Sequence, residues 1–336
     1  MVARKRFTAY AWSLLAFAIA VVLWGAGVRA TGSGAGCGDQ WPLCNGGWLP
    51  QNPAVHTIIE FTHRITSGPT LGLLVVGLVV FAFRLFPRGH IVRRLAVLVA
   101  VFTVTEALIG AALVLLGHVG TNSSPNRAYS LAIHLLNTMV LLAAMALTAW
   151  FAGAPESRRE TTTNQQLSRS LVVCVPLAFL TISVTGAIAA LGDTLFAVRS
   201  LSQGLQQDLS PTAHIFVRLR VWHPIVAVLL GCFLVAVAGV VLSRRPATRA
   251  RRLATAVIIL TFVQAGAGAI NILLLAPVWM QITHLFIADL LWIALVLFAA
   301  ELIGFDPTRA YGDLRAVSYS PGVRPAASSS SAPANR

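Results

Sequence analysis

The chain has 336 residues, of which 57% are hydrophobic and only 11% are charged, and its mean hydropathy is +0.77. Soluble domains carry about 25% charged residues, so this composition excludes an ordinary globular protein. The net charge of +14 raises the question of nucleic-acid binding. The basic residues cluster in short segments between long apolar runs, however, which is typical of membrane proteins, so no nucleic-acid partner is expected.

Eight stretches of roughly 20 apolar residues are each long enough to cross a bilayer as a helix. They cover residues 9–29, 58–83, 95–116, 128–151, 171–192, 217–242, 253–275 and 281–303. We therefore predict an all-α integral membrane protein with eight transmembrane helices. The first stretch lacks an A-x-A cleavage site and begins too near Met1 to follow a transit peptide. This predicts a retained anchor and a multi-pass protein of the bacterial cytoplasmic membrane.

The distribution of Lys and Arg predicts the orientation. When the segments between spans are assigned alternately to two sides, 19 of the 25 basic residues fall on the side of the N-terminus. Because basic residues near helix ends stay cytoplasmic, both termini are predicted to be cytoplasmic. The tail 304–336 is rich in Ser, Ala and Pro and is predicted to be disordered.

The sequence looks duplicated. The matching runs are Val22–Ala26 with Val184–Ala187, and Glu106–Ala111 with Gln264–Ala269. Small residues in these runs permit close helix packing. We predict two pseudo-symmetric four-helix bundles, residues 1–152 and 171–303, joined by a cytoplasmic linker, 153–170. Because four spans return the chain to the same side, the repeat should be parallel.

Four of the eight histidines lie near the starts of the second, fourth, sixth and eighth spans. These spans all run inward, so His63, His134, His223 and His284 share one depth, toward the outer side. A single such histidine is as readily explained by a helix–helix hydrogen bond, but four in register indicate a function. A zinc site would need all four around one ion, whereas the repeat favours one site per half. Histidines on facing helices suit the axial positions of a haem, which predicts two haem sites, His63 with His134 and His223 with His284.

The two halves differ beside these histidines. Glu60 stands one turn before His63, and Arg64 follows it, whereas Arg220 and a proline take the matching places around His223. A carboxylate beside a histidine suits proton transfer or the stabilisation of developing positive charge. Arginine suits a haem propionate instead. The first half is therefore predicted to be reactive and the second to hold a haem, with a structural Glu60–Arg64 ion pair as the alternative.

Other polar residues have simpler explanations. Cys37 and Cys44 in the first outer loop are placed to form a disulfide, and a structural staple and a redox role stay equally open. Cys174 lies within a span, as does a further cysteine, Cys232, and both are expected to pack. Glu106 and Asp289 are intramembrane carboxylates, and Asp289, which lies off the helix face of His284, is expected to make a helix–helix hydrogen bond.

With these motifs in order, the sequence resembles the haem A synthases, the CtaA/Cox15 family. The resemblance covers about residues 10–303. The residues that carry it are Thr31–Gly34, Cys37, Trp41–Gly46, the Glu60-x-x-His63-Arg64 motif, His134, His223 and His284.

The resemblance implies oxidation of the C8 methyl of haem O to a formyl group, giving haem A for terminal oxidases. It implies haem b as prosthetic group on His223 and His284, a substrate haem on His63 and His134, and Glu60 as catalytic carboxylate. It also implies that Cys37 and Cys44 are a disulfide-capable pair. Haem O synthase is a candidate partner; the electron acceptor, the oxygen source and a homo-oligomeric state are left open.

The sequence departs from the family in two places. The loop 193–216 lacks the second cysteine pair that some relatives carry, and Pro224 replaces an arginine after His223. Arg218 or Arg220 is therefore expected to contact the propionates. Two rival functions are kept: a non-catalytic di-haem electron carrier, and a transporter, which would require helices broken at matching places in the two halves.

Overall fold

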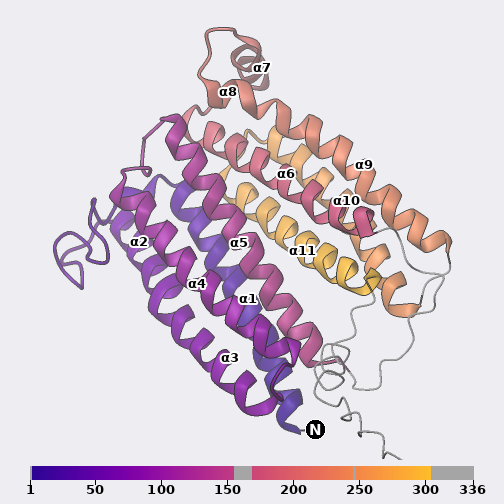
Figure 1. Ribbon diagram of the computed structural model, residues 1–336. Coiled ribbons are helices and arrows are strands. Elements are labelled where there is room, and N and C mark those ends of the chain that lie inside the picture. Colours follow the sequence, from indigo (N-terminus) through magenta and orange to yellow (C-terminus); the bar gives the residue numbers. More distant parts are fainter. Residues whose placement is uncertain (1, 155–168, 245–246, 304–336) are drawn as a thin grey trace, which may run out of the picture.

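The computed structural model describes residues 2–154, 169–244 and 247–303. The described residues are helical, and eight spans are long and apolar enough to cross a membrane, which confirms the predicted fold class. Most of the predicted linker 153–170 and the whole tail 304–336 lie outside the described residues. Figure 1 shows the long helices running side by side through the molecule.

The eight spans consist of ten α-helices and one π-helical segment. They are α1 (Val2–Ala30), α2 (Val55–Ile65) with η2 (Thr66–Thr70) and α3 (Leu71–Leu85), α4 (Ile91–Leu115), α5 (Pro125–Ala152), α6 (Arg169–Leu195), α8 (Ile215–Arg220) with α9 (Trp222–Ser243), α10 (Thr248–Leu273) and α11 (Val278–Leu302). Two short helices lie in loops, η1 (Ser33–Ala35) and α7 (Leu201–Leu209).

The second and sixth spans are not continuous α-helices. Pro69 has no backbone N–H to donate, and the chain widens to a π-helix over Thr66–Thr70 before α3 continues. In the sixth span the break falls at Val221, between α8 and α9. One break follows its histidine and the other precedes it, so the breaks do not occupy matching places.

The helices of each half pack mainly on one another. In the first half, residues 2–154, α4 packs against α3 and α5, and α1 packs against α3 and α5. In the second half, residues 169–303, α10 packs against α9 and α11, and α6 packs against α8, α9 and α11. Corresponding helices therefore have corresponding neighbours.

The halves meet along α1, α5, α6 and α11, where the buried apolar core is concentrated. Trp292 of α11 donates from its indole nitrogen to the carbonyl of Met139 in α5, at 2.7 Å. Arg29 of α1 donates to the carbonyl oxygen of Ala190 and to Thr194 in α6, and also to Gln281 in α11. Polar bonds in an apolar bundle fix which helix faces meet.

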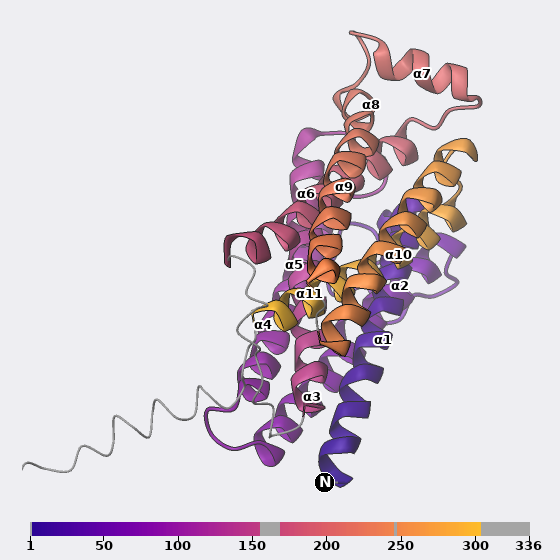
Figure 2. The same ribbon diagram turned by 90° about the vertical axis from the view of Figure 1, so that its right-hand side faces the viewer.

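The two long loops lie at the end of the molecule opposite the N-terminus, called here the loop end (Figures 1 and 2). They are residues 31–54 and residues 196–214, which contain α7. The spans that carry the four histidines all begin at this end, and each histidine follows the first residue of its span by six to nine residues. The four histidines therefore lie at similar depth.

Candidate functional site

Each of the four histidines lies against a glycine of a neighbouring helix. A Cβ atom added at Gly25 of α1 would stand 2.9 Å from Cε1 of His63, and one at Gly186 of α6 would stand 2.9 Å from Cε1 of His223. Added Cβ atoms at Gly110 of α4 and Gly268 of α10 would stand 3.9 and 3.1 Å from Cε1 of His134 and His284, respectively. These glycines occupy matching positions of the repeated runs. They were expected to serve helix packing, and the structure places them beside the predicted ligands.

The nitrogens of these imidazoles are poorly satisfied by the protein. Nδ1 is buried without a hydrogen-bond partner in His63, His134 and His284, whereas Nδ1 of His223 lies 3.1 Å from Oγ1 of Thr185. An unpartnered polar atom in an apolar bundle costs free energy. This arrangement fits residues whose nitrogens serve a ligand.

The second pair of histidines is brought together. The ring centroids of His223 and His284 are 6.4 Å apart, with planes at 84°. A metal ion lies about 2 Å from a coordinating imidazole nitrogen, so this separation accommodates one ion between two rings. Among the described residues, no such ring contact is recorded between His63 and His134, which lie against α1 and α4. In the described part of the chain, no group of three or more His, Cys, Asp or Glu side chains is placed to hold a metal ion by itself.

Glu60 is tied to the cysteine loop. Its side chain is buried; Oε2 accepts from the backbone N–H of Cys37 at 2.8 Å, and Oε1 accepts from Nη2 of Arg64 at 2.5 Å. Nη1 of Arg64 donates to the carbonyl oxygens of Gln40 and Leu43. The ion pair that the sequence left as the alternative is therefore present, and it fastens the loop to α2 close to His63.

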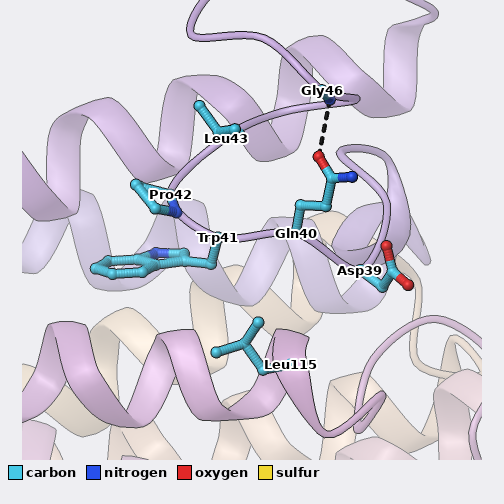
Figure 3. A pocket seen from close by; sticks show the side chains of 7 residues that line it. All are labelled: Asp39, Gln40, Trp41, Pro42, Leu43, Gly46 and Leu115. Carbon is cyan, nitrogen blue, oxygen red and sulfur yellow. Dashed lines mark hydrogen bonds between the residues drawn. The ribbon is translucent and has the colours of Figure 1, made fainter.

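Cys37 and Cys44 form a disulfide within this loop, and both side chains are buried. The loop borders an open pocket of about 610 Å³. Figure 3 shows Asp39–Leu43 and Gly46 on one side of this pocket and Leu115, at the end of α4, on the other. None of the four histidines lines it, so the pocket belongs to the cysteine loop and not to the histidine sites.

Arg220 holds the second loop in a comparable way. Its Nε donates to Asp208 of α7 at 2.5 Å, and its Nη1 lies 3.3 Å from Asp193 of α6. The carboxylate that stands on the helix in the first half is thus replaced by carboxylates in α6 and the loop. Contact of Arg220 with a haem propionate stays a prediction.

Two expectations for the remaining polar residues are wrong. Asp289 is fully buried, yet neither of its carboxylate oxygens has a hydrogen-bond partner, so it makes no helix–helix hydrogen bond in the described structure. Cys174 and Cys232 are exposed on their helices and do not pack in the core, because a position within a span does not determine which face it occupies. Glu106, for which no such bond was predicted, accepts from Asn137 and Thr138 of α5.

Comparison with known protein families shows to which family the chain belongs. The model of the COX15-CtaA family, described as cytochrome oxidase assembly protein, matches residues 8–296. The chain belongs to the COX15-CtaA family. This is the family of the haem A synthases, membrane oxidoreductases that bind haem.

Individual COX15-CtaA relatives carry two names. A protein of Thermus thermophilus named protoheme IX farnesyltransferase is 46% identical over 301 residues, which cover 89% of this chain and 49% of the relative. A heme A synthase of Bacillus mycoides is 46% identical over 99 residues, 30% of this chain and 32% of the relative, and one of Bacillus cereus is 47% identical over 97 residues, 29% and 31%. The chain thus spans about half the length of the Thermus relatives it matches.

Proposed function

We propose that this protein is a haem A synthase that oxidises the C8 methyl of haem O to a formyl group. The observation that carries the proposal is the repeated histidine–glycine arrangement, two in each half, together with a carboxylate beside the histidine of the first half alone. Two successive hydroxylations, each taking its oxygen atom from water, release four electrons and four protons in all, and the resulting diol loses one water to give the aldehyde. The electrons leave to a membrane electron acceptor.

His223 and His284 would hold haem b in the second half, where it supplies one-electron chemistry. The two side chains come from α9 and α11, and their ring centroids lie 6.4 Å apart. Gly186 and Gly268 leave the rings without a competing side chain on the adjoining helices. Thr185 orients the imidazole of His223 through Nδ1.

In the first half, His63 and His134 would bind the substrate haem, and Glu60 would act on the methyl group being oxidised. A carboxylate that is already fixed by Cys37 and Arg64 needs no reorganisation when positive charge develops near it. Arg64 keeps this carboxylate in place and holds the cysteine loop over α2. The apolar macrocycle and its farnesyl tail would enter from the bilayer.

The location follows from the same proposal. The eight apolar spans are those of a multi-pass membrane protein. We place it in a bacterial cytoplasmic membrane with the loop end outward, because the opposite end carries most of the basic residues. The name of the Thermus relatives, whose chains are twice as long, supports haem O synthase as a functional partner, since farnesylation of protohaem makes haem O.

Farnesyl transfer by this chain itself is the second candidate, favoured by that name. Prenyl diphosphates are bound through Mg²⁺, which takes carboxylate and phosphate oxygens. No cluster of acidic residues able to hold an ion occurs in the described residues, and the name belongs to a chain of which half has no counterpart here. Supplying protohaem and farnesyl diphosphate tests it, and formation of haem O would favour this candidate.

The deciding experiment is to purify the full chain in detergent and to identify the haems by chromatography and mass. Haem b together with haem O, hydroxylated haem or haem A is expected. The Glu60→Gln variant should keep the haem content and lose the formyl product, because the amide keeps the size of the side chain and removes its charge. Two haem b per chain without any product would favour the electron carrier, and normal product from Glu60→Gln would exclude the catalytic role of Glu60.

A further inference from the structure

The fourth span of each half presents its histidine to a pair of residues spaced one turn apart on the neighbouring helix. His134 faces Glu106 and Gly110 of α4, and His284 faces Gln264 and Gly268 of α10. Residues i and i+4 lie on the same helix face. In both halves, therefore, the histidine faces a polar residue and a glycine on one face of the neighbouring helix. They differ in the polar group and in the nitrogen that it faces: a carboxylate lies near Nδ1 of His134 in the first half, and an amide lies near Nε2 of His284 in the second.

The carboxylate of Glu106 is held by donors from the partner helix. Oε2 accepts from Nδ2 of Asn137 at 2.6 Å, and Oε1 accepts from Oγ1 of Thr138. Thr105 donates to Oδ1 of Asn137 at 2.7 Å, which turns the amide nitrogen of Asn137 toward Glu106. With these groups in place, Oε1 lies 3.5 Å from Nδ1 of His134.

The second half has no such support. The residues that correspond to Asn137 and Thr138, counted from the histidine, are Ile287 and Ala288, which donate no side-chain hydrogen bond. Nε2 of Gln264 lies 3.1 Å from Nε2 of His284, while Oε1 of Gln264 is buried without a partner. The polar support is therefore specific to the carboxylate of the first half.

We infer that Glu106 is a positioning residue that acts through His134 and makes the substrate site electronically unlike the second site. This inference rests on the proposed function, in which His134 binds the substrate haem. Oε1 of Glu106 lies 3.5 Å from Nδ1 of His134 and makes no hydrogen bond with it in this structure. A small approach of the ring would make Glu106 the acceptor for Nδ1–H, which would leave Nε2 as the nitrogen presented to iron. A carboxylate behind a ligating imidazole makes the ligand more electron-rich and favours the ferric state. Gln264 exerts no such effect on His284.

Redox titration of the full chain in detergent, with haem O added to saturation, tests this. Glu106→Gln, which copies the second half, should move the midpoint potential of one haem to a more positive value and leave the other unchanged. Gln264→Glu is the matched variant and should lower the potential of the other haem. Glu106→Asp keeps the charge, so the midpoint potential of this variant should stay near that of the parent protein. This variant separates the electronic role of Glu106 from its packing. Unchanged potentials in Glu106→Gln, or equal shifts of both haems, would overturn the inference.

A histidine variant separates this inference from the proposed function. His134→Ala should abolish the low-spin spectrum of one haem. If it does, and Glu106→Gln leaves both midpoint potentials unchanged, the inference fails while the proposed function stands. If His134→Ala leaves both spectra intact, the haem assignment fails together with the inference that depends on it.

Discussion

The glycines beside the histidines determine how much room each imidazole has. In Gly268→Ala the new Cβ would stand 3.1 Å from Cε1 of His284, closer than ordinary van der Waals contact, so the ring must shift. Gly266, two residues earlier on α10, has no atom within 4 Å of an added Cβ. We expect Gly268→Ala to weaken haem binding about tenfold, the usual cost of disturbing a ligand from its second shell. The haem-to-protein ratio after purification measures this, and equal ratios in Gly268→Ala and Gly266→Ala would contradict it.

Individual site residues were predictable to different degrees. The four histidines stood out because ionisable residues within apolar spans are rare. The Glu60–Arg64 ion pair, which the sequence left as the alternative for Glu60, joins residues at i, i+4 spacing. Gly25 and Gly186 were matched as repeats, but a repeat shows which residues correspond and not which side chain each one faces. The bond from Cys37 N–H to Glu60 joins a loop to a helix and left no signal in the local sequence.

At the scale of elements, Arg220 joins α7 to the bundle through ion pairs. Arg220 bonds Asp208 of α7 and Asp193 of α6, whereas Arg218, on the same short helix, is exposed. Arg220→Gln should remove the charged bonds and speed amide exchange in Leu201–Leu209 roughly tenfold, as expected when a hydrogen bond to a charged group is lost. Arg218→Gln is the control. Equal exchange in Arg220→Gln and Arg218→Gln would show that α7 is held by other contacts.

The spans themselves were predictable because length and hydropathy decide which segments can cross a bilayer. Their interruptions were less so. Pro69 lies inside the second span, and hydropathy alone does not distinguish a straight helix from one that widens over Thr66–Thr70. The short helix α7 was missed because its sequence has no apolar run, and its place depends on the ion pairs of Arg220.

At the scale of the whole molecule, the repeat predicted two similar bundles but not how they meet. The contact is made by the first and last spans of each half, α1 and α5 with α6 and α11. Periodicity could not predict this, because spans that are apolar on all sides show no preferred face. The hydrogen bonds of Arg29 and Trp292 determine which faces of these helices meet, which the apolar surfaces alone do not.

Arg29 is positioned to couple the two sites through this contact. It stands one turn after Gly25, which touches His63, and it bonds Gln281, which stands one turn before His284. Arg29→Gln should therefore destabilise the protein by about 2 kcal/mol and disturb the spectra of both haems, since hydrogen bonds from a partly buried charge across the contact are lost. Arg127→Gln is the matched control, because Arg127 is a buried arginine whose side-chain hydrogen bonds go to Gly120 and Asn122 of its own half. Thermal unfolding in detergent and the visible spectra measure both effects. If Arg127→Gln disturbed both haems as strongly as Arg29→Gln, the coupling would lie in general stability and not in the contact between the halves.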